Sequence, residues 1–251
     1  YDIIGTAYSN NSFAYSLPVV HGLKPHFGPL SGGTNVTIFG QHLNVGGKRE
    51  VKLNGVNCTV VEIDNDGIIC KSGSNTFHSG NDIVVFIDNH AISSNLTFTY
   101  MSDPVFLGVD GLTSIERGGM NVTVKGRNLN HVASPTMVVR FFSPQKEEIA
   151  RLESPCIVQN NGIEMKCKTP KLPKHLRPDR KDTAIQSSAS FSMDGAPEFN
   201  VIGVNNSDSV TLLYFADPVF KAEDEVQQVN LNDRVLVIHG EHLSNKYQVK
   251  V

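Results

Sequence analysis

The feature that most constrains this chain is an internal repeat. Three segments open with Pro-Val, and each leads to a glycine that ends a stretch of predicted strand. The openings begin at Pro18, Pro104 and Pro218, and the glycines are Gly40, Gly126 and Gly240. Both landmarks are 86 residues apart in the first step and 114 residues apart in the second. Because two landmarks keep the same spacing, the sequence predicts a series of similar modules.

The repeat divides the 251 residues into four parts. We expect residues 1–17 to be the C-terminal strand of a preceding module, because Ser12–Ser16 resembles the segments that close the later modules. Residues 18–102 and residues 103–216 are expected to be complete modules, the second with longer loops. Residues 217–251 are expected to be the N-terminal part of a further module, so the sequence is expected to be a section of a longer array.

Polar and apolar residues alternate in the way that is typical of half-buried antiparallel strands. Asn35–Phe39 places Val36 and Ile38 on one side, and Asn121–Val124 repeats the pattern. Turn phrases such as Asn54-Gly55 separate short strands, and no stretch has a sustained helical period with caps. Strands of this length in units of about 90 to 110 residues predict an all-β fold of tandem immunoglobulin-like sandwiches.

Charge and hydropathy exclude several classes of function. The chain has 22 Lys and Arg residues against 25 Asp and Glu residues, a formal net charge of -3, so no global field favours nucleic acid or an anionic membrane. No apolar run approaches the roughly 20 residues that span a bilayer. This segment is therefore predicted to bind no nucleic acid and to lie outside the membrane.

Catalytic and cofactor motifs are missing from the sequence. Gly32-Gly33 and Gly118-Gly119 lack the Gly-Lys-Ser/Thr of a phosphate-binding loop and are predicted to form turns. The cluster His239-Gly-Glu-His242 aligns with the segment around His42 and falls at a strand end, so we expect turn residues there and no metal site. The sequence predicts no enzyme activity and no cofactor.

The four cysteines allow three disulfide connectivities. Cys58 and Cys70 are 12 residues apart in the first module, and Cys156 and Cys167 are 11 apart in the second, so the repeat favours the pairs Cys58–Cys70 and Cys156–Cys167. Zinc is the competing hypothesis, but neither pair has the short Cys-x-x-Cys spacing or a neighbouring histidine cluster. Two structural disulfides, each contributing about 3 kcal/mol in the chain-entropy model, imply an oxidising compartment.

N-glycosylation is expected on some of the Asn-x-Ser/Thr sequons. The six sequons begin at Asn10, Asn35, Asn57, Asn95, Asn121 and Asn205. Asn35 and Asn121 occupy equivalent places on the polar side of the strand alternation, where a glycan projects into solvent. Asn57 directly precedes Cys58, and we expect crowding by the disulfide to lower its occupancy.

Positive charge is concentrated in one stretch, Lys171 to Lys181. A heparan sulfate contact and a dibasic processing site at Arg177-x-x-Arg180 are two functional hypotheses for it. The stretch lies in an insertion of the second module, so we favour a solvated, mobile loop.

Several phrases resemble a known module family. They are the Pro-Val openings, Gly28-Pro-Leu-Ser-Gly-Gly-Thr34, the glycine-ended strand followed by His42-Leu-Asn44, and the paired cysteines. Together they are similar to the immunoglobulin-like IPT or TIG domains that plexins share with Rel-type transcription factors. The linker-free succession of modules looks like the membrane-proximal stalk of a plexin, and the stalk of the hepatocyte growth factor receptor is similar.

The resemblance implies an extracellular scaffold in a type I single-pass receptor of the cell membrane. In plexins such modules hold a semaphorin-binding head away from the membrane, in signalling that includes axon guidance, and receptor self-association is a further implied property. The alternatives are a stalk of a hepatocyte growth factor receptor-like tyrosine kinase and, less favoured because the chain is mildly acidic, a Rel-type DNA-binding module. A third alternative, an accessory module of a carbohydrate-active enzyme, lacks the usual aromatic platform because the chain has no Trp.

Overall fold

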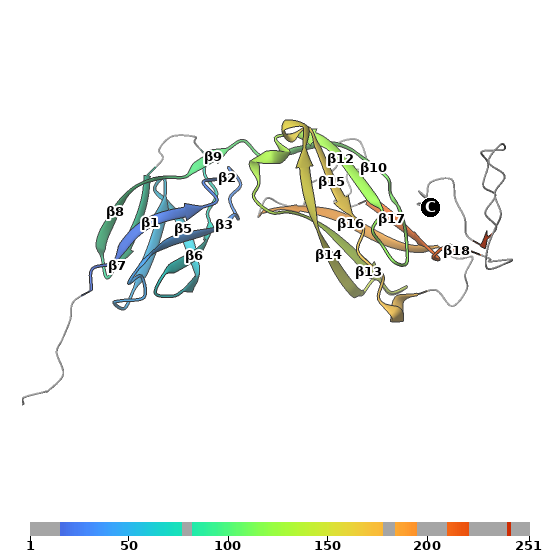
Figure 1. Ribbon diagram of the computed structural model, residues 1–251, viewed down its shortest axis with the longest axis horizontal. Helices are drawn as coiled ribbons and strands as arrows, with labels where there is room; N and C mark the ends of the chain where they lie inside the picture. Colours follow the sequence, from blue (N-terminus) through green and yellow to red (C-terminus); the bar gives the residue numbers. More distant parts are fainter. Residues whose placement is uncertain (1–15, 77–81, 178–183, 195–209, 221–239, 242–251) are drawn as a thin grey trace, which may run out of the picture. The chain divides into compact units, whose positions relative to one another are not determined.

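The fold is built almost entirely from short β-strands (Figure 1). The computed structural model describes residues 16–76, 82–177, 184–194, 210–220 and 240–241. Contacts divide the chain into two compact units, Tyr1–Met101 and Ser102–Val251. Within the described residues the helical segments are three-residue 3-10 turns, which are η1 (Leu129–His131), η2 (Asn160–Gly162) and η3 (Lys174–Leu176). The predicted all-β, immunoglobulin-like class is confirmed.

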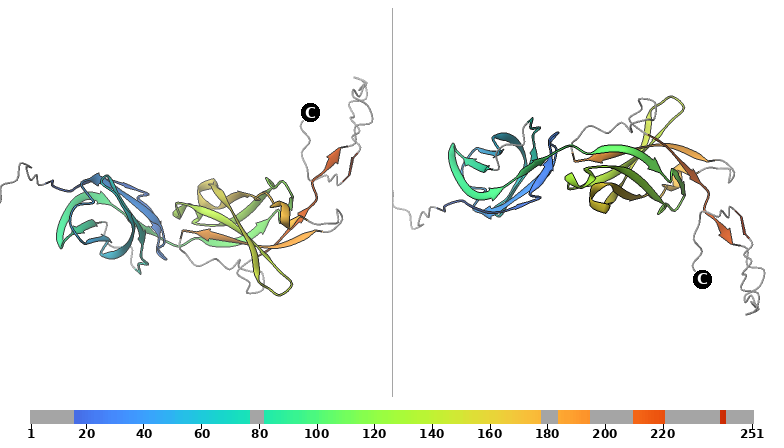
Figure 2. Two further views of the ribbon diagram at one scale, coloured as in Figure 1. Left: turned by 90° about the horizontal axis from the view of Figure 1, so that it is seen from below. Right: turned by 90° about the horizontal axis from the view of Figure 1, so that it is seen from above.

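The first unit is a seven-stranded sheet folded on itself, with a small parallel pair added. Its strands are β1 (Val19–Lys24), β2 (Phe27–Pro29), β3 (Asn35–Gln41), β4 (Arg49–Leu53), β5 (Val56–Ile63), β6 (Gly67–Ser72), β7 (Asp82–Ile87), β8 (His90–Thr97) and β9 (Thr99–Met101). The order is β1-β3-β6-β5-β4-β7-β8, and β2 pairs with β9. The folded sheet forms two layers (Figure 2). The first residues of β5 pair with β4 and the rest pair with β6, so β5 passes from one layer to the other.

The second unit repeats this topology. Its strands are β10 (Val105–Asp110), β11 (Thr113–Ile115), β12 (Asn121–Arg127), β13 (Pro135–Phe142), β14 (Glu148–Gln159), β15 (Glu164–Lys168), β16 (Ile185–Met193), β17 (Val210–Phe215), β18 (Val219–Phe220) and β19 (Gly240–Glu241). Eight of them follow the order β10-β12-β15-β14-β13-β16-β17-β11, and β18 pairs with β19. The long strand β14 pairs with β13 over Glu148–Pro155 and with β15 over Cys156–Gln159, so it passes from one layer to the other.

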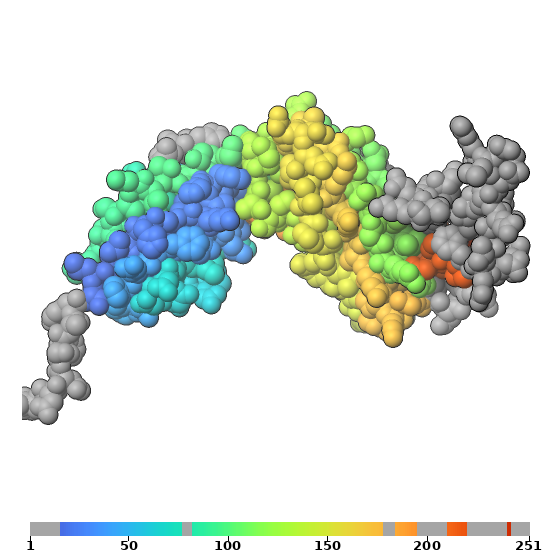
Figure 3. All heavy atoms as spheres, in the orientation of Figure 1, coloured from blue at the N-terminus to red at the C-terminus, as the bar shows by residue number. Residues whose placement is uncertain are grey.

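Strand alternation creates a separate apolar core in each unit. The strands β3 and β12 have the same burial pattern, with outward Asn35 and Asn121 exposed and the following valines fully buried. Ile38, Ile68 and Leu53 meet in the first core, and equivalent residues fill the second. On the face that Figure 3 shows, side chains of the first unit close over this interior. Each buried aliphatic side chain contributes about 1.5 to 3 kcal/mol, so the cores carry most of the favourable burial energy.

A carboxylate closes the same loop in both units. In the first unit both Asp88 oxygens accept the backbone N–H of Gly47 at 2.9 Å, and Oδ1 also accepts the N–H of Lys48 at 2.7 Å. In the second unit Asp194 accepts the N–H groups of Ala133 and Ser134 at 3.0 and 2.9 Å. Each aspartate therefore holds the loop that leads into β4 or β13 against the turn after the neighbouring strand.

The Asp88 contact predicts a pH dependence of stability. The backbone N–H groups of Lys48 and Gly47 lower the pKa of Asp88. Because the folded pKa lies below the unfolded value, the stabilisation is complete above the unfolded pKa, about 4, and is lost as the pH falls through the folded pKa. We expect Asp88→Asn to destabilise the first unit at pH 7 and to make its urea midpoint less sensitive to acid.

The matched control is Asp82→Asn, at an exposed position of the same unit. Urea midpoints measured from pH 7 to pH 2 compare the two variants with the parent chain. An acid dependence that is the same in Asp88→Asn and in the parent would contradict this account of the loop.

Candidate functional site

The disulfides join neighbouring strands of one sheet in each unit. Cys58 on β5 bonds to Cys70 on β6, and Cys156 on β14 bonds to Cys167 on β15, as the repeat predicts. The bridges differ in register. Cys156 lies directly opposite Cys167, whereas Cys58 lies opposite Ser72. All four cysteines are buried, so both disulfides serve as parts of the core.

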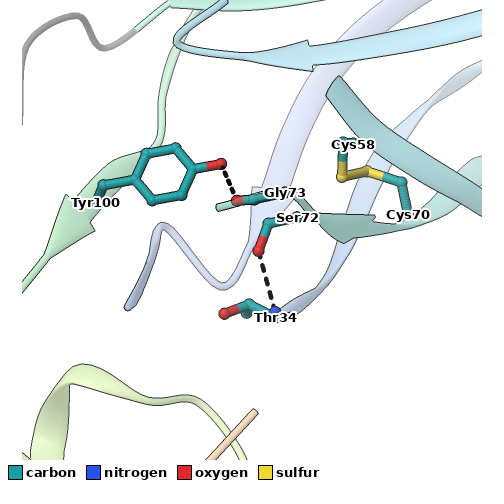
Figure 4. The surroundings of a disulfide bond; sticks show 6 residues. All are labelled: Thr34, Cys58, Cys70, Ser72, Gly73 and Tyr100. Carbon is teal, nitrogen blue, oxygen red and sulfur yellow. Dashed lines mark hydrogen bonds between the residues drawn. A yellow bond between two sulfur atoms is a disulfide. The ribbon is translucent and has the colours of Figure 1, made fainter. Parts of the chain in front are cut away.

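A glycine turn is hydrogen-bonded to the strand that carries the second cysteine, and Figure 4 shows one of these bonds, between Thr34 and Ser72. Gly32 and Gly33 have positive φ angles of 76° and 83°, which glycine adopts without strain. The N–H of Gly33 donates to the Ser72 carbonyl at 2.7 Å, and the N–H of Thr34 donates to Ser72 Oγ at 3.0 Å. Ser72 N–H donates back to the Thr34 carbonyl at 2.9 Å. Ser72 thus forms hydrogen bonds to the backbone groups of the turn with both its main chain and its side chain.

The second unit builds the same turn although it lacks the Gly-Pro of the first. Gly118 and Gly119 again have positive φ angles, of 70° and 82°. The N–H of Gly119 donates to the Thr169 carbonyl at 2.8 Å, and the N–H of Met120 donates to Thr169 Oγ1 at 3.0 Å. Ser72 and Thr169 each stand two residues after the second cysteine of their unit. Sequence reasoning missed both hydroxyl residues, although this constant offset was available to identify them.

A buried tyrosine completes each of these two sites. Tyr100 Oη donates to the Gly73 carbonyl at 3.0 Å, and Tyr214 Oη donates to the Pro170 carbonyl at 3.0 Å. Burial raises the pKa of Tyr100 to about 12 and also raises the pKa of Tyr214. Both phenols therefore stay protonated donors at neutral pH. We call the glycine turn, the hydroxyl residue, the disulfide and the tyrosine of each unit its turn anchor.

The groups of the turn anchor hold the strands and the turn together. Its polar groups bond to one another, and its cysteines are oxidised. No group of three or more His, Cys, Asp or Glu side chains is placed to hold a metal ion within the part of the chain that the structure describes. His42 lies after β3 with a positive φ of 56°, as a turn residue would. The predicted turn residues His239 and His242 lie outside the described residues.

Four of the six predicted sequon asparagines are exposed on strands. They are Asn35, Asn57, Asn95 and Asn121. Asn35 lies opposite Lys71 and Asn121 lies opposite Lys168, so the two equivalent sequons have equivalent neighbours. The sequons at Asn10 and Asn205 lie outside the described residues.

The structure removes the reason for expecting crowding at Asn57. Successive residues of a strand face opposite sides, and here Asn57 is on the exposed side whereas Cys58 is 1% exposed on the core side. The disulfide therefore points away from the Asn57 side chain.

The basic stretch differs from the expected mobile loop over Lys171–Arg177. Leu172 is buried at 1% exposure, and its N–H donates to the Glu116 carbonyl at 2.8 Å. Arg177 forms an ion pair with Glu116 at 3.5 Å. The expectation was wrong for these residues because an apolar side chain in the insertion reaches the core; residues 178–183 lie outside the described part.

The two glycines of one turn provide a matched pair of variants. A Cβ on Gly118 would lie 2.6 Å from backbone atoms of Pro170 and Thr169, whereas a Cβ on Gly119 would meet nothing within 4 Å. We expect Gly119→Ala to lower the free energy of unfolding by about 1 kcal/mol, the cost of the left-handed backbone, and Gly118→Ala by roughly 3 kcal/mol or more. Urea unfolding followed by circular dichroism measures both, and equal losses would contradict the steric argument.

The tyrosine hydroxyls are tested by Tyr100→Phe and Tyr214→Phe. Each change removes one hydroxyl donor, while the ring stays in the core. The carbonyl of Gly73 or of Pro170 then loses this hydrogen bond. We expect each unit to lose about 1 to 2 kcal/mol of unfolding free energy. The same urea experiment reports the loss, and a variant as stable as the parent would contradict the expected contribution of the hydroxyl.

Comparisons with known proteins agree with this geometry. The model of the IPT/TIG domain family matches residues 18–100. A solved structure of the plexin A4 full extracellular region matches with a TM-score of 0.66 and 26% identity, over 89% of this chain and 19% of that one. A second plexin A4 extracellular structure matches with a TM-score of 0.44 and 20% identity, over 84% of this chain and 20% of that one.

The chain thus spans about a fifth of the plexin extracellular region that it matches. Among the described residues no helix is both long and apolar enough to span a membrane. Two buried disulfides and the plexin similarity fit an extracellular segment. Residues 18–100 are an IPT/TIG domain, and the chain is built of immunoglobulin-like modules similar to those of plexin extracellular regions.

Proposed function

We propose that this chain is a segment of the extracellular stalk of a plexin-type, type I single-pass receptor. In this role it spaces a semaphorin-binding head from the cell membrane and has no catalytic activity. The observation that carries the proposal is the similarity to the plexin A4 extracellular region, at 26% identity over 89% of the chain. We further propose that residues 18–102 and 103–216 are its two complete modules, between the end of one module at 1–17 and the start of another at 217–251.

The residues at the two ends of the proposed second module bond to groups of the second unit. The Ser102 carbonyl lies 2.8 Å from His131 Nδ1, and the Asp103 carbonyl accepts a hydrogen bond from Asn128 Nδ2 at 3.3 Å. Asp217, which precedes the third Pro-Val, accepts the Arg117 N–H at 2.9 Å and forms an ion pair with Arg117 Nε at 3.0 Å. These bonds fix the residues that flank the second complete module within the second unit.

The alternative receptor is a hepatocyte growth factor receptor-like tyrosine kinase, whose stalk is built similarly. A Rel-type DNA-binding module is less favoured, because the disulfides need an oxidising compartment and the net charge is -3. Retention on duplex DNA that weakens with salt is the result that would favour it.

The extracellular placement is tested on chain secreted from eukaryotic cells. We expect non-reducing peptide mapping to recover Cys58–Cys70 and Cys156–Cys167, and we expect an endoglycosidase to lower the mass. Asn35→Gln and Asn121→Gln should each remove one glycan, because both asparagines are exposed. Free thiols at Cys58 and Cys70 in secreted protein would sink the placement.

The spacing role is tested in the parent receptor at the cell surface. In one version a flexible Gly/Ser linker replaces this segment, and in a control two unrelated immunoglobulin-like modules of similar length replace it. We expect the linker version to bind semaphorin but to signal weakly, and we expect the control to keep most of the signal. Full signalling by the linker version would refute a spacing role, and loss of signal in the control would show that this segment makes specific contacts.

A further inference from the structure

A row of exposed lysines follows β15 and continues beyond its end in the second unit. Lys166 and Lys168 point outward from β15, which lies between β12 and β14 in the sheet (Figure 1). Lys171 and Lys174 are exposed in the segment that follows. We call Lys166, Lys168, Lys171 and Lys174 the basic strip. Buried Thr169 and Leu172 alternate with these lysines, so the apolar residues point inward and the charges point outward.

The backbone of the basic strip is held in place. The Pro170 carbonyl accepts the Tyr214 hydroxyl at 3.0 Å, and the Leu172 N–H donates to the Glu116 carbonyl at 2.8 Å. Beyond Leu172, the turn η3 packs Leu176 against the core. A ligand that meets these lysines therefore does not have to order a loop first, which lowers the entropic cost of binding.

Three of the four charges have no acidic partner among the residues that the structure describes. Lys166 forms an ion pair with Glu164 at 3.2 Å, but no ion pair joins Lys168, Lys171 or Lys174 to an acidic side chain in the described part of the unit. Other basic residues of this unit are neutralised, among them Lys125 by Asp110. Unpaired ammonium groups in a row create a local positive potential on a chain whose net charge is negative.

We propose that the basic strip binds a linear sulfated polysaccharide of the heparan sulfate type. Lys166 and Lys168, two residues apart on β15, are about 7 Å apart along the strand. Lys171 and Lys174 follow within six residues of Lys168, so the strip offers several cations close together in the sequence to a chain that carries regularly spaced anions. Nucleic acid and anionic lipid leaflets share this chemistry, but they belong mainly to the inside of the cell. The choice of polysaccharide therefore rests on the extracellular placement proposed above.

The experiment measures binding of the full chain to immobilised heparin by surface plasmon resonance at several salt concentrations. The test variant is the triple substitution Lys168→Gln, Lys171→Gln and Lys174→Gln. The control variant is Lys24→Gln, Lys71→Gln and Lys146→Gln, which removes the same charge from exposed positions elsewhere. Circular dichroism and urea unfolding verify that both variants fold like the parent.

We expect the parent and the control to bind heparin in 0.15 M salt and the test variant to bind about tenfold more weakly or worse. The slope of log K against log salt should fall by about one unit for each lysine removed, as for other polyanion contacts. No binding by the parent, or the same affinity for both triple variants, would overturn the proposal. Preference for duplex DNA or for phosphatidylserine vesicles over heparin would also overturn it.

A glycan on Asn121 is a variable that the experiment has to separate, because this asparagine lies opposite Lys168. The measurements are therefore repeated with Asn121→Gln protein, in which we expect the same difference between the triple variants. The purified protein reports heparin binding whether or not it is secreted, whereas thiol mapping reports placement. Failure of the strip and failure of the extracellular placement are thus distinguished.

Discussion

The hydrogen bonds between the glycine turn and the strand of the second cysteine are the constraint on which each unit depends. They join the chain before β3 or β12 to the end of β6 or β15, across a gap of 38 residues from Thr34 to Ser72 in the first unit. They place the second cysteine in register and bring a carbonyl within reach of the buried tyrosine. Closing so long a loop costs entropy, and paired backbone groups together with the disulfide offset that cost.

The same framework carries different outer surfaces in the two units. On the sheet that contains β3, Phe39 packs over Gly22, where an added Cβ would lie 3.3 Å from the ring. At the equivalent place in β12 stands Lys125, paired with Asp110, and the neighbouring strand β15 carries the basic strip. Interior positions are restricted by packing, whereas outward positions are free to vary, so modules of one fold present different surfaces to their surroundings.

Much of the fold was predictable because it follows from local rules repeated along the chain. Alternation places Val36 and Val122 in the cores, and equal spacing predicts the pairing of Cys58 with Cys70. The contribution of Asp88 was not predictable in this way. Its side chain bonds to backbone groups about 40 residues away in the sequence, and no local pattern encodes such a contact.

By itself the sequence determined that the chain is built of β modules with one cysteine pair in each compact unit, because repeats, alternation and turn residues are local properties. Only the tertiary structure decided which charged side chains the outer surface presents on a fixed backbone. Lys171 and Lys174 were predicted to lie in a mobile insertion, but the burial of Leu172 and the Tyr214 hydrogen bond to Pro170 place them on a fixed backbone. Whether a charge is paired and held in place depends on neighbours that are distant in sequence, and only the folded chain brings these together.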